Sequence, residues 1–237
     1  MPIESLEEEN YELTELAIYY AVYRKVLSGK YQLNGRFLTR KGQAGPDVVT
    51  LLKGYIKDKD ECTLKEVEEQ VAELTGGGNR QHAFRALYDT MVRVTKDRFV
   101  APRFVHFPVE KVDEALSGFI PDRFRAIKAV TTFAMFPHCG QSWNHYLLES
   151  FCYRYSKRYR LCVLNFNDKN AGIIAENSFD GDYDEMLSAA VARAKPRLEL
   201  SSDVIGKYLF DNGYLARRTD SRMEEIVRRA SELRDRR

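Results

Sequence analysis

The sequence has few cysteines and no long apolar run, and each absence narrows the classes of protein that it can encode. The 237 residues include four cysteines, Cys62, Cys139, Cys152 and Cys162, without the spacing of a disulfide framework. No apolar segment is long enough to span a membrane, and the start does not resemble a signal peptide. We therefore expect a cytoplasmic chain with reduced thiols and no membrane partner.

A strong net charge is also lacking. The chain carries 37 Lys and Arg against 35 Asp and Glu, a formal net charge of +2, which neither requires nor excludes a nucleic-acid ligand. The distribution is uneven, because residues 4–15 hold six glutamates, whereas 154–160 and the end from residue 217 are rich in arginine. Each charge run taken alone fits a solvated helix face. With 44% hydrophobic and 30% charged residues, the chain has the composition of a folded globular protein.

Turn-forming residues divide the chain into four segments, 1–45, 46–108, 109–180 and 181–237. Apolar residues at helical spacing predict a first helix over 6–27, which ends before Gly29. The glycine- and proline-containing stretch 41–46 is a linker. We expect segment 1–45 to be an N-terminal helix with this linker.

Segment 46–108 has the clearest pattern. Apolar stripes predict helices over 48–56, from 64 to the glycines at 76–78, and over 81–91. Thr63 and Glu66 form a capping-box sequence at the start of the second helix. After Met91 the apolar period changes to alternation, which predicts a β-hairpin around 95–97. Three helices followed by a hairpin is the order of a winged helix, and the alternative is that they belong to some larger fold.

The last two segments follow a similar but looser order. In 109–180 we expect helices over 112–120, over 124–135 and from Trp143 with Ser142 as its cap, then a hairpin with strands at 161–166 and from Ile173. In 181–237 we expect helices over 184–194 and after Ser202, a left-handed cap at Gly213, and an extended strand at 214–218. The predicted fold class is mainly α with short β-hairpins (α+β), with winged-helix-like units in tandem.

No motif predicts catalysis or a bound cofactor. The glycines at 76–78 follow a helix rather than a strand and lack the ending of a phosphate-binding P-loop. His138, Cys139, His145 and Cys152 lie close in sequence but lack zinc-site spacing. No nucleophile elbow is present. We therefore expect a protein that is not an enzyme and holds no metal or cofactor, although a site assembled from scattered residues is an open, less favoured alternative.

Basic and amide side chains on the predicted helix-and-wing elements favour nucleic acid as a ligand, because these groups contact phosphates and base edges. The third helix and hairpin of 46–108 offer one set, the stretch 154–160 a second, and the predicted strand 214–218 a third. The candidate contacts are Asn79, Arg80, Gln81, Arg85, Arg93, Lys96, Arg98, Arg154, Lys157, Arg158, Arg160, Arg217 and Arg218.

Two functions are compatible with this sequence. The first is a DNA-binding protein whose winged-helix units read or grip duplex DNA, as a regulatory or non-catalytic component of a larger complex. The alternative is an adaptor whose winged-helix units dock partner proteins. Basic residues on the predicted wings favour DNA, whereas the near-neutral net charge and the acidic first helix favour the adaptor. Segment 136–144, with the single tryptophan Trp143 as an expected core anchor, has no assigned role.

Overall fold

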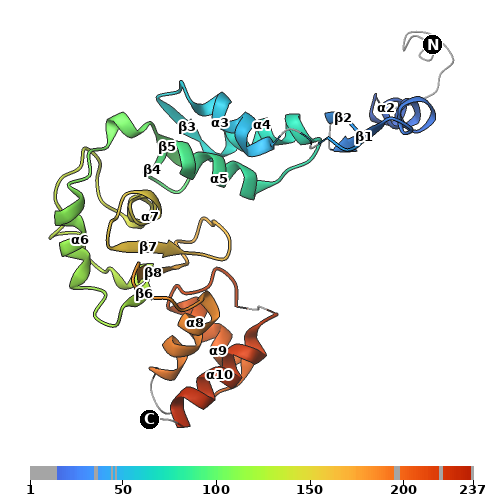
Figure 1. Ribbon diagram of the computed structural model, residues 1–237. Coiled ribbons are helices and arrows are strands. Elements are labelled where there is room, and N and C mark those ends of the chain that lie inside the picture. Colours follow the sequence, from blue (N-terminus) through green and yellow to red (C-terminus); the bar gives the residue numbers. More distant parts are fainter. Residues whose placement is uncertain are drawn as a thin grey trace.

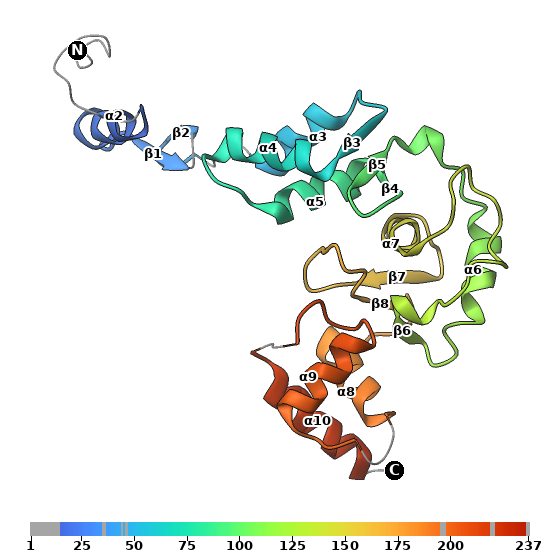
Figure 2. The same ribbon diagram turned by 180° about the vertical axis from the view of Figure 1, so that it is seen from behind.

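The computed structural model describes residues 15–34, 37–43, 45, 47–194, 198–218 and 221–235. The fold class is α+β, with about 49% helix and small antiparallel sheets, which confirms the predicted class at this level. The elements follow an open arc that begins with an N-terminal helix and hairpin and ends with three helices (Figures 1 and 2). Two units that each contain a three-stranded sheet form the middle of the arc.

The N-terminal part is a short rod followed by a hairpin. Helix α2 (Glu15–Val22) continues into one π-helical stretch, η1 (Tyr23–Leu27), and β1 (Tyr31–Asn34) pairs antiparallel with β2 (Phe37–Arg40). The first predicted helix is thus confirmed over 15–27, and its earlier part lies outside the described residues. None of the described side chains between 15 and 43 is buried.

The first sheet unit contains the elements predicted for its segment. Glu66 N donates to Thr63 Oγ1 at 3.2 Å and Thr63 N to Glu66 Oε2 at 2.6 Å, so the predicted capping box is present. One strand, β3, was not predicted, because three residues are too few to show alternation. The sheet order is β3-β5-β4, and the three helices pack on one core. The elements are α3 (Val48–Ile56), β3 (Glu61–Thr63), α4 (Leu64–Thr75), α5 (Arg80–Thr90), β4 (Val92–Arg93) and β5 (Arg98–Val100).

The second sheet unit departs from the prediction at one helix. Residues 124–135 do not form a helix: Phe124 begins strand β6, and 130–144 form an irregular loop. Ser142 is not the cap of the next helix either, because Tyr146 N and Leu147 N donate to Asn144 Oδ1 at 2.9 and 3.1 Å. The sheet order is β6-β8-β7. The elements are η2 (Pro102–Phe104), α6 (Val109–Ser117), β6 (Phe124–Ala126), η3 (Ile127–Ala129), α7 (His145–Arg154), β7 (Tyr159–Cys162) and β8 (Ile173–Glu176).

The C-terminal unit is helical, with α8 (Tyr183–Ala192), α9 (Ser202–Asp211) and α10 (Met223–Asp235). Gly213 has φ +77°, the left-handed conformation that the sequence predicts after α9. The expected strand at 214–218 is wrong, since these residues form bends that no strand pairs with. Helix α10 was not predicted, because its charged residues conceal a narrow apolar stripe made of Met223, Ile226 and Ala230.

The second sheet separates two hydrophobic cores. In β8, Ile174 packs with the core of α6 and α7, whereas Ile173 and Ala175 pack with the core of α8, α9 and α10. Alternate side chains of a strand point to opposite faces, so both faces of this strand are covered. The C-terminal helices therefore complete the sheet of the preceding unit, and residues on both sides of the predicted boundary at 180 share one core.

Within the described ranges, no helix is both long enough and apolar enough to cross a membrane.

Candidate nucleic-acid interface

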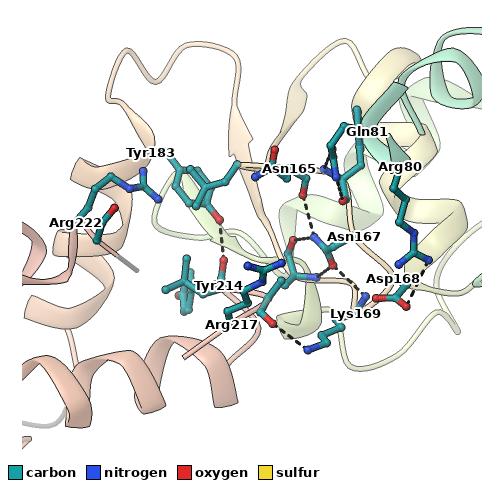
Figure 3. A pocket seen from close by; sticks show the side chains of 16 residues that line it. Arg80, Gln81, Asn165, Asn167, Asp168, Lys169, Tyr183, Tyr214, Arg217 and Arg222 are labelled. Atoms are coloured by element: carbon teal, nitrogen blue, oxygen red, sulfur yellow. Dashed lines mark hydrogen bonds and ion pairs between the residues drawn. The ribbon is translucent and has the colours of Figure 1, made fainter. Parts of the chain in front are cut away.

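A cleft of about 740 Å³ lies between the start of α5, the β7–β8 loop (163–172) and the segment that follows α9. Figure 3 shows side chains from all three segments around it. Its lining contains four cationic side chains, Arg80, Lys169, Arg217 and Arg222, and one carboxylate, Asp168. We name this hollow the basic cleft. An excess of cations in a concave site concentrates positive potential there.

The β7–β8 loop is fixed to the first sheet unit by Gln81. Its Nε2 donates to the carbonyl of Phe166 at 2.9 Å, and Phe166 N donates to Gln81 Oε1 at 3.0 Å (Figure 3). Within the loop, Asn167 Oδ1 accepts from the backbone N–H groups of Lys169 and Ala171 at 3.0 and 3.2 Å. These bonds hold a ten-residue loop in one conformation, so the cleft that it lines is preformed.

A buried ion pair lies behind the loop. Arg93, with 0% of its side chain exposed, places Nη1 3.1 Å from Glu149 Oε2 and 2.9 Å from the carbonyl of Asn167. Glu149 also accepts from Asn170 Nδ2 at 3.0 Å and from the Tyr88 hydroxyl. Burial raises the pKa of the Glu149 carboxyl, and the Arg93 guanidinium opposes that shift. The network joins β4 and α5 of the first sheet unit to α7 and the loop of the second.

The cleft cations differ in how far the chain already neutralises them. Arg80 Nε lies 2.8 Å from Glu68 Oε1, and its Nη2 lies 3.7 Å from Asp168 Oδ2. Lys96 Nζ approaches the same Asp168 oxygen at 3.6 Å, so two cations share one carboxylate. Lys169 Nζ donates to the carbonyl of Ala216 at 3.2 Å and lies 5.6 Å from the centre of the Phe210 ring, and it has no carboxylate partner among the described residues. The exposed Arg217 has no ion pair or hydrogen bond to any other described residue. Lys169 and Arg217 therefore keep positive charge that an anionic ligand can neutralise.

Several of the side chains predicted to contact nucleic acid meet at this place. Arg80, Gln81 and Arg217 line the basic cleft, and Lys96 lies beside it through Asp168. Asn79 is the cap of α5, where its side chain accepts from Gln81 N at 3.1 Å. Arg80 of the first predicted set and Arg217 of the third, which are 137 residues apart in sequence, thus line the same cleft.

A second hollow of about 600 Å³ shares Gln81, Tyr183 and loop residues 164–166 with the basic cleft. Arg85, Tyr153 and Arg160 also line it. Arg160 Nη2 donates to the carbonyl of Phe179 at 2.6 Å, which fixes this guanidinium beside the hollow. Two further cationic side chains therefore lie at a hollow that adjoins the basic cleft.

The remaining predicted side chains lie elsewhere. Arg93 is the clearest departure, because a fully buried guanidinium that pairs with Glu149 cannot contact a ligand at the surface. The stretch 154–160 runs from the end of α7 through a turn at 155–158 into β7, and Asp113 Oδ2 accepts from Lys157 N and Arg158 N, both at 3.1 Å. The other side chains have local partners: Arg98 pairs with Glu61, Lys157 with Glu110 and Arg158 with Glu176, Arg154 donates to the carbonyl of Asp89, and Arg218 lies over the ring of Phe210.

Sequence reasoning missed Lys169 and Arg222. Lys169 lies in a stretch that predicts only a turn, and nothing local in sequence indicates that this turn faces α5. Arg222 precedes the unpredicted helix α10, and its Nη1 lies 2.7 Å from Asp184 Oδ1. The sequence signal for Arg222 was the arginine-rich end of the chain, which does not single out one position.

The histidines and cysteines near α7 do not converge. Across the ranges described above, no three His, Cys, Asp or Glu side chains gather as metal ligands do. His145 Nε2 lies 2.9 Å from the carbonyl of Val130, and burial lowers the pKa of its imidazole. Cys139 and Cys152 are buried, which raises the pKa of both thiols.

Comparison of the chain with models of protein families, with curated protein sequences and with solved structures found no match.

Proposed function

We propose that this protein binds duplex DNA through the basic cleft, as a non-catalytic component of a larger complex. The observation that carries the proposal is the meeting of four cationic side chains around one preformed loop. Neutralisation of phosphates by Lys and Arg supplies most of the affinity of proteins for DNA. A cleft with a single carboxylate, already shared by two cations, suits an anionic polymer better than a cationic or neutral ligand.

The order of elements supports winged-helix-like units as the framework. In the first sheet unit the order is α3-β3-α4-α5-β4-β5, and the closing strand β5 lies between the other two. The second sheet unit repeats this order as α6-β6-α7-β7-β8, with β8 in the middle. The loop 130–144 stands where the first unit has its middle helix. In this proposal the β7–β8 loop is the wing of the second unit.

We propose that the protein grips phosphates rather than reads base edges with a helix. Helix α7, the counterpart of a recognition helix in the second unit, buries residues 147–152. On α5 the side chain of Gln81 is engaged by the β7–β8 loop, while Arg80 and Arg85 remain exposed. Contacts to phosphates position a protein without specifying sequence. We therefore expect salt-dependent binding with little preference for sequence.

The test measures the affinity for a fluorescent mixed-sequence duplex by anisotropy over a series of salt concentrations. The cleft variant is R80Q/K169Q/R217Q, and the matched control is R98Q/K157Q/R158Q, which removes three cations outside the cleft. For each phosphate that the cleft variant no longer neutralises, the slope of log affinity against log salt should fall by about 0.9. We expect a smaller slope and weaker binding for the cleft variant alone.

Absence of binding by the unaltered protein at low salt would overturn the proposal. An equal loss of affinity in the control variant would also contradict it, because the interaction would then depend on overall charge and not on the cleft. Circular dichroism of all three proteins checks that the substitutions leave the fold intact.

A second candidate function, a protein-docking adaptor, is favoured by two exposed apolar side chains on neighbouring segments. Met135 on the loop 130–144 and Phe104 in η2 expose 79% and 45% of their surface. The two segments are adjacent, because His106 N donates to the carbonyl of Cys139 at 2.9 Å. Exposed apolar groups that gather in one place are typical of protein-binding surfaces. A pull-down with F104D/M135D discriminates the two functions: an adaptor loses its partner but keeps any affinity for DNA, whereas recovery of no stable partner by the unaltered chain counts against the adaptor.

A further inference from the structure

Among the side chains that the structure describes between residues 17 and 43, none is buried, although residues 15–27 are rich in apolar side chains. Ten of the thirteen residues over 15–27 are apolar, all except Glu15, Arg24 and Lys25. Val26 exposes 73% of its surface, Val22 48% and Tyr20 45%. A helix that is apolar around its whole circumference is normally covered on several sides. In this helix the side chains of Val22 and Val26 are exposed to solvent.

The neighbouring hairpin does not supply the missing cover. Among the described strands, β1 and β2 pair with each other and with no third strand. An isolated hairpin and a short isolated helix are each marginally stable in water. The rod and hairpin also extend away from the two sheet units at one end of the arc (Figures 1 and 2). Their stability therefore requires packing against something beyond the described chain.

The acidic and basic residues of this region lie in two separate blocks, so the region carries opposite charges at its two ends. Residues 1–15 contain six acids and no base, and residues 16–46 contain six bases and no acid. The boundary between the two blocks lies at the start of α2. The rod over 15–27 is about 20 Å long at 1.5 Å per residue. It therefore separates Glu15 at its start from Arg24 and Lys25 in its last turn.

We propose that α2 and η1 are a self-association surface on which a second copy of this chain packs antiparallel. In that arrangement the acidic end of each rod lies beside the basic end of the other, and the exposed faces of Val22 and Val26 cover one another. A parallel arrangement would place like charges together, which is unfavourable. Two-fold contacts between identical surfaces are the commonest form of protein association. This inference is independent of the function proposed for the basic cleft.

The first experiment measures the mass of the full chain in solution by light scattering after size exclusion, over a range of concentrations. We expect twice 27.5 kDa for the unaltered protein and a single chain for V22D/V26D, with a dissociation constant raised about tenfold or more. M135D is the matched control, because Met135 is as exposed as Val26 but lies on another unit, and it should stay dimeric. A monomeric unaltered protein, a dimeric V22D/V26D or a monomeric M135D would each overturn the proposal.

A charge-exchange experiment tests the antiparallel pairing without relying on apolar substitutions. R24E/K25E makes the basic end of the rod acidic, and E8K/E9K/E12K/E15K changes the net charge of residues 1–15 from −6 to +2, so each variant alone should be mostly monomeric. Mixed in equal amounts, the two should form a heterodimer, because acidic ends then meet basic ends. If the mixture stays monomeric while circular dichroism shows both variants folded, the charge argument is wrong and a different partner covers the rod.

Discussion

The first sheet unit (47–101) and the second (109–176) place a helix before the closing hairpin of their sheets, and the two helices differ in their surroundings. In the first unit α5 starts at the surface with Arg80, beside the basic cleft. In the second unit α7 buries residues 147–152, including the charged Glu149. The same order of elements therefore provides a surface helix in one unit and a core helix in the other.

The hairpins of the two units differ in length and in what they contact. A four-residue connection, 94–97, joins β4 to β5, whereas ten residues, 163–172, join β7 to β8. The short hairpin packs against the start of α7, where Asn144 Nδ2 donates to the carbonyl of Val94 at 2.9 Å. The long hairpin loop reaches α5 and lines the basic cleft. The first unit therefore lines the cleft with its helix α5 and packs with its hairpin, whereas the second unit lines the cleft with its hairpin loop and packs with its helix α7.

The largest loss of stability is expected at the buried ion pair that joins the two sheet units. R93M removes one partner of the buried pair with Glu149 and leaves an uncompensated buried carboxylate, which should lower the free energy of unfolding by about 3–5 kcal/mol. R98M, at the exposed pair with Glu61, should change it by less than about 1 kcal/mol. Urea denaturation followed by circular dichroism measures both. Similar losses in the two variants would show that Arg93 does not act as a buried charge.

The next prediction compares how much the N-terminal caps of α5 and α7, Asn79 and Asn144, stabilise the protein. N79A removes one hydrogen bond, to Gln81 N at the start of α5, and should cost about 1 kcal/mol. N144A removes two bonds from α7 together with the bond to Val94, and should cost about 2 kcal/mol. Urea denaturation decides the order. A larger loss for N79A would mean that α7 is held mainly by its apolar contacts.

The elements that the sequence predicts correctly are those whose signals are local. The capping box at Thr63 and Glu66, the stripes of the three helices in the first unit and the left-handed Gly213 each depend on residues within a few positions. The predicted helix over 124–135 failed because Phe124 pairs with Ala175, far along the chain, and this pairing overrides the apolar period.

The candidate site was predicted only in part, because local patterns in the sequence do not show which side chains meet in space. Arg80 and Arg217 were chosen for their charge and their positions on a predicted recognition helix and a predicted wing strand, and the structure brings them to one cleft. Arg93 was chosen in the same way, yet it is buried, because its partner Glu149 lies 56 residues away and no local pattern reveals it. Lys169 was missed because only tertiary structure shows which turn lines a cleft.

A smaller loss of stability, together with weaker binding to DNA, is expected when the contact between α5 and the β7–β8 loop is removed. Q81A removes the two hydrogen bonds to Phe166 and should lower the free energy of unfolding by about 1 kcal/mol. The freed loop no longer holds Lys169 at the cleft, so binding to DNA should weaken and the salt slope should fall by up to about 0.9, the contribution of one phosphate. Anisotropy titrations at several salt concentrations measure both quantities. An affinity and a slope that both stay unchanged would contradict this account, since the loop would then not position Lys169 for a phosphate.

The smallest effect concerns the first residue of each helix, which is the exposed Arg80 in α5 and the half-buried His145 in α7. Burial lowers the pKa of His145 in the folded protein below its ordinary value of 6.5. Below pH 6.5 the unfolded chain therefore binds more protons than the folded one, and the free energy of unfolding should fall as the pH drops. H145Q should reduce this dependence, whereas H138Q, at an exposed position of the same unit, should leave it in place. Urea denaturation at about pH 7.5 and about pH 5.5 gives the comparison. If H145Q and the unaltered protein lose the same stability between these values, the acid sensitivity belongs to other groups, and the start of α7 is no more sensitive to pH than that of α5.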